Sequence, residues 1–224
     1  MRDWDATDPY DLSDFAGDLL KVIEATDKEK VHLVGISMGG MISQQFALEY
    51  PERLHSLTSL SSTAFFYDPD LVGLSTFIKM HMARLEISYS KEIKDQLMRR
   101  LETVSILRNK APLPHDIALM TAQKGMFNFI PPRGSNPAAT DRHIKAIEKS
   151  GSRIESLKNL KIPTLVMHGT EDPLVLFEHG KKTAETIPGA KFVSLEGMGH
   201  IIPEDHTPTM VAEIHQHVQQ NLNN

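Results

Sequence analysis

A serine between glycines, in the run Gly35-Ile36-Ser37-Met38-Gly39, is the first group of residues in this chain that could do chemistry. A serine hydroxyl is a weak nucleophile until a base takes its proton and the chain presents the oxygen to a substrate. A sharp turn from a strand into a helix presents the oxygen, because it holds the serine in a strained conformation while glycines let neighbouring backbone approach. The spacing therefore predicts a nucleophilic Ser37, with an ordinary glycine-rich turn as the alternative.

A carboxylate and a histidine follow later in the chain, in the order that such a serine would need. Asp172 lies in the loop of residues 168–173, directly after an apolar run, and His200 lies in a glycine-flanked loop after the next apolar run. Parallel strands bring their carboxyl ends to one edge of a sheet, which would collect these side chains there. We expect His200 to act as the base and Asp172, rather than its neighbour Glu171, to orient the imidazole.

The N–H of Met38 is the expected donor to the oxyanion that forms when the serine attacks a carbonyl carbon. It lies at the start of the helix that follows Ser37, where backbone N–H groups lack partners and the helix dipole is positive. Metal chemistry and a cofactor are not expected, because the chain has no cysteine and no histidine pair has the H-E-x-x-H spacing of zinc sites. His32 and His168 lie in or beside apolar runs and are interpreted as hydrogen-bonded structural residues.

The elements that position these residues alternate between strand and helix at both ends of the chain, which predicts an α/β fold with a mostly parallel sheet covered on both faces. Helical spacing predicts a helix over residues 13–26 with Ser13 as its N-cap. Residues 31–34 are expected to form a strand buried on both faces. Further helices are expected over residues 38–50 and 177–187, and strands over residues 54–60, 164–167 and 191–195. The last helix is expected to place Val211, Ile214, Val218 and Leu222 on one face.

Residues 64–158 follow a different pattern, rich in methionine, lysine and glutamate and without a strand signal. This block is expected to be a helical cap inserted into an α/β-hydrolase-type core of residues 1–63 and 159–224. Most of its methionine and phenylalanine side chains are interpreted as helix core, although some would form the roof of the site. Proline-containing breaks separate expected helices over residues 70–82, 91–108, 116–127 and 140–150.

The composition excludes several classes of protein. With 40% hydrophobic and 24% charged residues, the 224-residue chain is typical of a globular protein with one sizeable core. The net charge of −5 comes without a basic stripe that could follow a phosphate backbone, so nucleic acid is not an expected partner. The sequence has no run of about 18 apolar residues and no signal-peptide pattern after Met1. No membrane association is expected, and the expected location is the cytoplasm.

Four motifs along the chain, around Ser37, Pro51, Asp172 and His200, resemble those of the α/β-hydrolase fold family. Within the family the chain is most similar to serine esterases that cleave methyl esters of aromatic polyketides, which share the early Asp8-Pro9-Tyr10. A serine at position 37 excludes the dehalogenase and epoxide hydrolase branches, which use aspartate as the nucleophile. The resemblance covers essentially the whole chain and is weakest in the cap. The motifs lie in residues 31–40, 50–53, 162–173 and 197–200.

The resemblance also implies a departure at the beginning of the chain. Family members usually have about three or four further strands before the serine strand, and a His-Gly loop among them supplies the second oxyanion N–H. This chain is expected to be N-terminally truncated, leaving the oxyanion to Met38 alone at a cost of about 10²–10³ in rate. The strand from Val31 to Gly35 would become a sheet edge, which could pair with another copy in a homodimer. Three explanations are ranked in this order: the chain is a fragment of a longer esterase, it works as such a homodimer, or it is a degenerate hydrolase that binds a ligand without efficient turnover.

The expected function is hydrolysis of a small apolar carboxylic ester through an acyl-enzyme. Ser37 would attack the acyl carbon, His200 would carry the proton, Asp172 would orient the imidazole and Met38 would bind the oxyanion. Two alternatives stay open. The fold could bind a ligand in an apolar pocket under the cap with impaired catalysis, or the same triad could serve a C–C hydrolase or perhydrolase.

Overall fold

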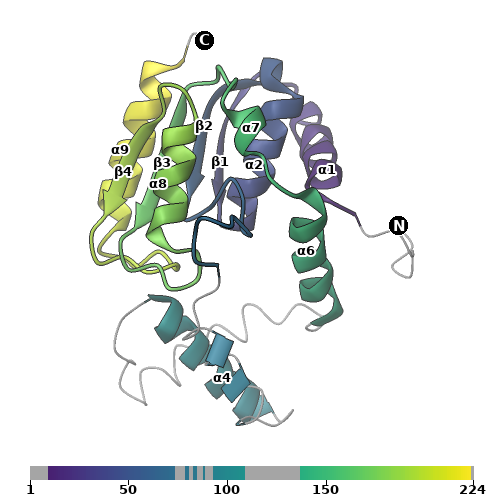
Figure 1. The fold of residues 1–224 in the computed structure, drawn as a ribbon. Helices are drawn as coiled ribbons and strands as arrows, with labels where there is room; N and C mark the ends of the chain where they lie inside the picture. The colour runs from purple at the N-terminus through teal and green to yellow at the C-terminus, as the bar shows by residue number, and fades with distance from the viewer. Residues whose placement is uncertain are drawn as a thin grey trace.

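A parallel four-stranded sheet organises the protein (Figure 1). The computed structural model describes residues 10–73, 79–80, 83–84, 88, 93–108 and 137–222. Within them the strand order is β1-β2-β3-β4, and each neighbouring pair is parallel. This arrangement confirms the predicted α/β fold. The strands are β1 (Val31–Ile36), β2 (Leu54–Leu60), β3 (Thr164–Gly169) and β4 (Lys191–Leu195).

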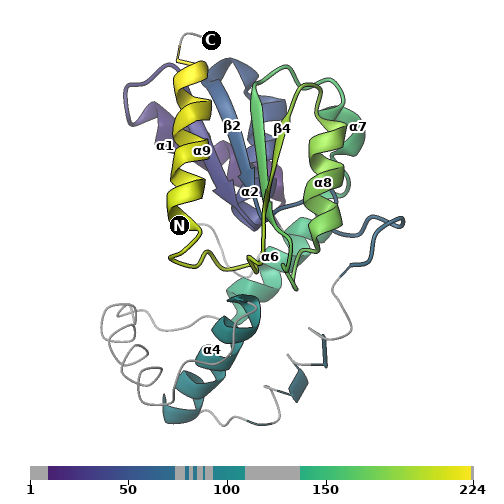
Figure 2. The ribbon, with the colours of Figure 1, turned by 90° about the vertical axis from the view of Figure 1, so that its left-hand side faces the viewer.

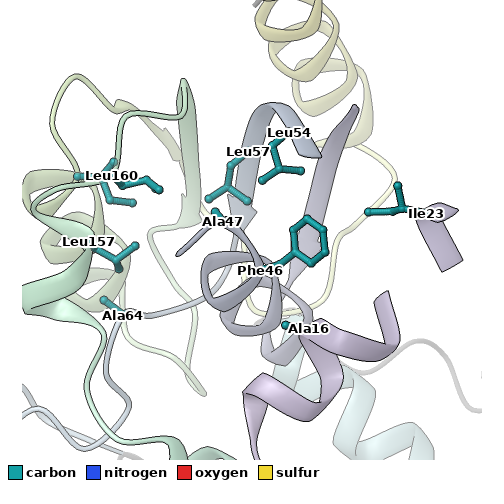
Figure 3. Close-up of a cluster of buried hydrophobic side chains, with 10 residues drawn as sticks. Ala16, Ile23, Phe46, Ala47, Leu54, Leu57, Ala64, Leu157 and Leu160 are labelled. Carbon is teal, nitrogen blue, oxygen red and sulfur yellow. The ribbon is translucent and has the colours of Figure 1, made fainter. Parts of the chain in front are cut away.

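Helices cover both faces of the sheet, and Figure 2 shows α8 and α9 on opposite sides of it. Two buried apolar clusters correspond to these layers. One joins α1, α2 and β2 around Phe46, which is completely buried (Figure 3). The other joins β3, β4 and α9 and includes Met167 and Met210. The helices of these layers are α1 (Leu12–Glu24), α2 (Met38–Glu49), the 3-10 helix η1 (Pro51–Arg53), α7 (Ile154–Leu157), α8 (Phe177–Thr186) and α9 (Thr207–Gln220).

The prediction that Ser13 caps the first helix is wrong, because the N-cap of α1 is Asp11. The Asp11 carboxylate accepts hydrogen bonds from the N–H groups of Ser13 and Asp14, and the Asp14 carboxylate accepts one from the Asp11 N–H. This reciprocal pair satisfies donors that the first turn leaves without partners. The Ser13 hydroxyl makes a different contact and donates to Glu49 on α2.

Strand β1 is not buried on both faces as predicted. Val34 keeps 48% and Ile36 keeps 41% of its surface exposed. The reason is the edge position that the resemblance implies for this strand: within the described residues β1 pairs with β2 alone. Gly35, between these two residues, points to the other face and is buried against α2.

The buried face of α9 differs by one position from the predicted one. Met210 and His217 are buried and Ile214 packs against the core, whereas Val211 and Leu222 are largely exposed. The two faces have the same helical spacing. The apolar pattern favours the wrong one because a histidine, here buried, counts as polar in such a pattern.

The described residues between β2 and β3 form helices and no strand, as predicted for this region. They include α4 (Ile93–Arg108) and α6 (Pro137–Ser150), and α4 lies away from the sheet in Figure 1. Residues 70–73 are not helical, and the helix predicted over residues 116–127 lies outside the described residues. The cap boundaries, residues 64–158, stay a prediction. None of the helices in the described ranges is long and apolar enough to cross a bilayer.

Strand β1 gives a testable prediction about self-association. An edge strand presents N–H and C=O groups that can pair with another chain, and exposed Val34 and Ile36 add apolar surface to this edge. We expect dimers at micromolar concentration in light scattering, and we expect Val34→Lys to shift the protein to the monomer, because a charge on an edge opposes pairing. A monomer of unchanged mass in both proteins would contradict pairing through β1.

Candidate active site

Ser37 is the single residue between β1 and α2, and its backbone is strained. Its φ is 55° and its ψ is −125°, in a region that residues with a side chain rarely adopt. Hydrogen bonds hold it from both sides. Its N–H donates to the Leu60 carbonyl at 2.9 Å, and its own carbonyl accepts from the Ser62 hydroxyl at 2.7 Å and from the Gly40 N–H at 2.9 Å. The adjoining end of β2 therefore fixes the turn.

The glycines near Ser37 have different roles from those predicted. A Cβ on Gly35 would lie 2.3 Å from the Gly39 carbonyl oxygen and 2.4 Å from the Ser43 hydroxyl, so this position requires glycine. A Cβ on Gly40 would lie 2.6 Å from the Ser62 side chain. A Cβ on Gly39 would meet no atom of the described residues within 4 Å, apart from its chain neighbours and the nearby backbone of α2. The expectation of a close approach thus applies to Gly35 and to the unpredicted Gly40, and not to Gly39.

The structure brings together the three side chains that the sequence pattern singles out. His200 Nε2 lies 3.0 Å from Ser37 Oγ, and His200 Nδ1 lies 2.8 Å from Asp172 Oδ2. The residues follow β1, β3 and β4, so parallel strands deliver them to one edge of the sheet. Asp172 and His200 are buried, whereas the neighbouring carboxylate of Glu171 is exposed. This arrangement can pass a proton from the serine to the imidazole while the carboxylate orients the ring.

The Asp172 carboxylate is held at both oxygens. Oδ1 accepts hydrogen bonds from the N–H groups of Leu174 and Val175, both at 2.9 Å. Burial acts to raise the pKa of this carboxyl, but the hydrogen bonds and charges of His168 and His200 outweigh burial and lower the pKa below its usual value. Asp172 therefore stays ionised at neutral pH, as a group that stabilises an imidazolium must.

His168 makes a contact with Asp172 that the sequence pattern does not reveal. The ring is expected to be hydrogen-bonded within the core, and its Nε2 does lie 2.8 Å from the Val175 carbonyl oxygen. The same Nε2 also lies 3.4 Å from Asp172 Oδ2. In the sequence, His168 and Asp172 are related only by their spacing of four residues. This spacing does not predict the contact unless the path of the loop after β3 is known.

Met38 is the first residue of α2, directly after Ser37. The N–H groups in the first turn of a helix have no acceptor within the helix, so the Met38 N–H suits an oxyanion developing on a carbonyl that Ser37 attacks. No strand of the described residues precedes β1, and none of the described loops therefore corresponds to the family's His-Gly loop.

The loop that carries His200 is hydrogen-bonded to the end of α4. The Leu107 carbonyl accepts from the N–H groups of His200, at 2.6 Å, and Ile201, at 3.1 Å. The contact is close, because a Cβ on Gly199 would lie 2.4 Å from the same carbonyl oxygen. Carbonyls in the last turn of a helix lack donors within the helix, and here the His200 loop supplies two donors to the Leu107 carbonyl.

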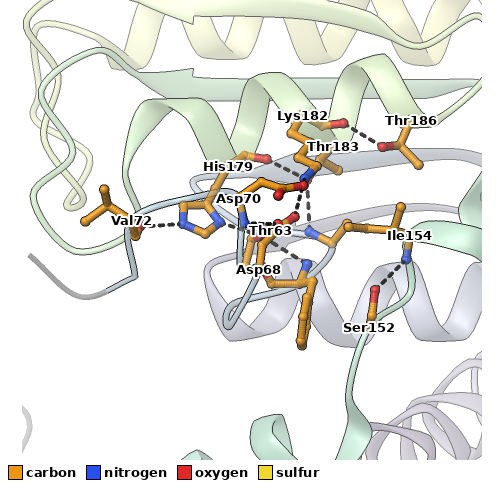
Figure 4. Close-up of polar contacts among 12 residues, drawn as sticks. Thr63, Asp68, Asp70, Val72, Ser152, Ile154, His179, Lys182, Thr183 and Thr186 are labelled. Carbon is orange, nitrogen blue, oxygen red and sulfur yellow. Dashed lines mark hydrogen bonds and ion pairs between the residues drawn. The ribbon is translucent and has the colours of Figure 1, made fainter.

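The segment that follows β2 is anchored to α8 by polar side chains (Figure 4). His179 Nδ1 lies 3.1 Å from the Thr63 hydroxyl and His179 Nε2 lies 2.9 Å from the Val72 carbonyl oxygen. Lys182 forms an ion pair with Asp68 at 2.6 Å. Burial acts to raise the pKa of Asp68, but the contact with Lys182 outweighs it and lowers the pKa. The start of the region between β2 and β3 is thus fixed to the core.

Arg153 anchors the other end of that region. Its guanidinium is buried and donates to the Thr63 carbonyl at 2.9 Å and to Gln44 Oε1 at 3.3 Å. Burial lowers the pKa of Arg153 to about 10. Because Gln44 lies on α2 and Thr63 follows β2, one side chain joins the returning chain to both elements that hold Ser37.

Histidines on β1 and β2 form a separate group. The His32 and His55 rings stack with centroids 5.0 Å apart, and His32 Nδ1 lies 2.8 Å from the Ser56 hydroxyl, as expected for a structural histidine. Burial, followed by the charges of His55 and His217, lowers the pKa of His32. Within the part of the chain that the structure describes, no group of three or more histidine or acidic residues is arranged to hold a metal ion.

Known proteins share this sequence pattern. A family profile described as alpha/beta hydrolase fold matches residues 2–207. Rhodomycin D methylesterase DauP from Streptomyces sp. (strain C5) is 28% identical over 221 residues, which cover 88% of this chain and 70% of that protein. A 2-hydroxy-6-oxo-6-phenylhexa-2,4-dienoate hydrolase from Burkholderia cepacia is 27% identical over 193 residues, covering 83% of this chain and 61% of that protein.

Solved structures agree in fold. A meta-cleavage product hydrolase from Pseudomonas fluorescens superposes with a TM-score of 0.68 at 18% identity, covering 97% of this chain and 75% of the other. A bromoperoxidase from Bacillus anthracis superposes with a TM-score of 0.69 at 22% identity, covering 100% of this chain and 77% of the other. The family profile covers most of the chain and shows that the chain belongs to the alpha/beta hydrolase fold family.

Proposed function

We propose that the protein is a serine hydrolase that cleaves carboxylic esters through an acyl-enzyme. The observation that carries this proposal is the continuous contact from Ser37 Oγ to His200 Nε2, at 3.0 Å, and from His200 Nδ1 to Asp172 Oδ2, at 2.8 Å. Membership in a family of hydrolases supports it. The strained backbone of Ser37 adds support, because such strain persists at sites where it serves function.

The reaction follows from the roles of these groups. Ser37 Oγ bonds to the acyl carbon while its proton moves to His200 Nε2, and the carbonyl oxygen becomes an oxyanion facing the Met38 N–H. The bond to the alcohol oxygen then breaks, and that oxygen takes the proton from His200. Water adds to the acyl-enzyme with His200 again as base, and the acyl–Oγ bond breaks as Ser37 recovers its proton. Asp172 holds the imidazole throughout and stabilises its charge.

The substrate we propose is a small apolar ester, with a methyl ester of an aromatic compound as the leading type. The similarity to rhodomycin D methylesterases from two Streptomyces strains supports this choice. The site would lie beneath a helical cap of residues 64–158, since α4 reaches the His200 loop through Leu107. The oxyanion donor that we propose is the Met38 N–H at the start of α2, and the loss of one such donor typically lowers the rate about 10²–10³-fold.

Carbon–carbon bond hydrolysis is the second candidate. Two similar proteins, from Burkholderia cepacia and Comamonas testosteroni, are named as hydrolases of 2-hydroxy-6-oxo dienoates and related compounds. The same serine, histidine and aspartate could serve that reaction. The two candidates differ in the bond that breaks, so a substrate panel separates them.

The test compares three kinds of substrate with one covalent probe. We expect hydrolysis of p-nitrophenyl acetate and of an aromatic methyl ester, slower turnover of a 2-hydroxy-6-oxo dienoate, and loss of all activity after one equivalent of a fluorophosphonate modifies Ser37. Peptide mapping by mass spectrometry would locate the modification. An active protein that prefers the dienoate would favour the second candidate. A protein with neither turnover nor labelling would contradict the proposal and favour a ligand-binding role.

A further inference from the structure

We propose that His168 is a positioning residue for Asp172, through an Nε2–H hydrogen bond to Asp172 Oδ2, the oxygen that also accepts from His200 Nδ1. This inference rests on the proposed function and deepens it. It adds a second histidine to the site, so that the contacts run from Ser37 through His200 and Asp172 to His168.

The contacts of His168 form a closed arrangement with the Asp172 loop. His168 is the fifth residue of β3 and is completely buried. Its Nε2 lies 2.8 Å from the Val175 carbonyl oxygen and 3.4 Å from Asp172 Oδ2, and the Val175 N–H in turn donates to Asp172 Oδ1 at 2.9 Å. Both groups facing Nε2 are acceptors, so the hydrogen bonds assign the ring proton to Nε2.

The second ring nitrogen is buried without a hydrogen-bond partner. His168 Nδ1 has none among the described residues, and a Cβ on Gly180 would lie 2.2 Å from it. Glycine at that position of α8 therefore makes room for the ring and locks its orientation. An unpaired buried nitrogen is unfavourable, and an apolar side chain would avoid that cost. The polar ring is explained by its Nε2–H, which lies 2.8 Å from the Val175 carbonyl oxygen and 3.4 Å from Asp172 Oδ2 and so fixes the loop that carries the carboxylate.

A second donor on Oδ2 changes how the carboxylate acts on His200. Oδ1 accepts from two backbone N–H groups, and Oδ2 faces His200 Nδ1 at 2.8 Å and His168 Nε2 at 3.4 Å, so a turn of the carboxylate would break several of these contacts. The charges of His168 and His200 both lower the pKa of Asp172. Without His168, more of the charge on Oδ2 falls on the His200 imidazolium, while the carboxylate gains freedom to turn.

The experiment compares two replacements of nearly equal shape. His168→Gln keeps an N–H donor near the position of Nε2, whereas His168→Met has similar length without a donor. His179→Met is the matched control, because His179 is also buried and also hydrogen-bonded to a backbone carbonyl, but its hydrogen bonds go to Val72 and Thr63 rather than to Asp172. Each protein is measured for kcat and KM on p-nitrophenyl acetate, for its pH–rate profile and for thermal unfolding.

We expect His168→Met to lower kcat roughly tenfold with little change in KM, as the loss of a hydrogen bond to a charged group implies. The acidic limb of its kcat/KM profile should move to higher pH, because the imidazolium of His200 is stabilised more. His168→Gln should recover most of kcat and the position of the limb. His179→Met should lose thermal stability and keep the profile of the original protein. Equal losses in His168→Met and His179→Met with unmoved profiles would overturn the inference.

A readout that needs no turnover separates this inference from the proposed function. The proton shared between His200 Nδ1 and Asp172 gives a downfield NMR resonance, which His168→Met should shift and His179→Met should leave in place. Activity that survives in Ser37→Ala would contradict the proposed function whatever this resonance does. If His168→Met fails to fold, Gly180→Ala replaces it, because the added Cβ would push the His168 ring away from its present position. An unshifted resonance in either variant would contradict the role of His168.

Discussion

Ser37→Ala is expected to lower kcat for ester hydrolysis by a factor of about 10⁴–10⁶, because it removes the atom that forms the acyl-enzyme. The thermal unfolding temperature should change little. The Leu60 carbonyl and the Ser62 hydroxyl anchor position 37 through its backbone N–H and C=O groups. These bonds do not use the Ser37 side chain, so they are kept in Ser37→Ala. The measurement is steady-state hydrolysis of p-nitrophenyl acetate with fluorophosphonate labelling.

Ser13→Ala is the control for this variant. Ser13 is a serine on α1 whose hydroxyl contacts Glu49, and its replacement should leave both activity and labelling at the level of the original protein. A Ser37→Ala protein that kept more than about a hundredth of the original kcat, a far smaller loss than removal of a nucleophile implies, would show that another group is the nucleophile.

Asp172→Asn is expected to lower kcat by about 10³–10⁴. The amide can present its NH₂ group to His200 Nδ1, which would place the ring proton on Nε2 and leave no lone pair facing Ser37. Glu171→Gln is the matched control, because it removes the neighbouring exposed carboxylate that the sequence offers as the alternative. We expect its kcat within about twofold of the original, since surface substitutions typically have small effects. A larger loss in Glu171→Gln than in Asp172→Asn would reverse the assignment.

Asp172→Asn also gives a stability prediction with a defined pH window. The pKa of Asp172 is lower in the folded protein than its ordinary value of 3.8, so its ionised form is stabilised by folding. That contribution is present above about pH 4 and is lost as the pH falls through the lower folded pKa. Urea unfolding should therefore show a difference between the original protein and Asp172→Asn that is constant from about pH 5 to pH 7 and shrinks below about pH 4. A difference that grew with acidity would contradict this.

Much of the fold could be predicted because its signals are local. Strands β2 and β4 have the bounds that the sequence predicts, and the turn at Ser37 follows from a five-residue motif. Ser37, Asp172 and His200 could be grouped because parallel strands place their carboxyl ends together, a rule that needs no knowledge of side-chain contacts.

The features that could not be predicted depend on contacts between distant segments. The burial of His217 depends on how α9 packs against β2. The contact of His168 with Asp172 depends on the path of one loop, and the bond from Leu107 to His200 joins two segments with no shared pattern. Periodicity describes one element at a time, so it contains none of this information.

The hydrogen bonds between α4 and the His200 loop use a backbone carbonyl as the acceptor. They therefore respond differently to substitutions than to insertions or deletions in α4. The Leu107 side chain can be exchanged without removing the oxygen that accepts from His200 and Ile201. Insertion or deletion of one residue within α4 is different, because it rotates the end of the helix by about 100° and carries that oxygen away. We therefore expect substitutions at Leu107 to leave this bond in place, and insertions or deletions of one residue within α4 to break it.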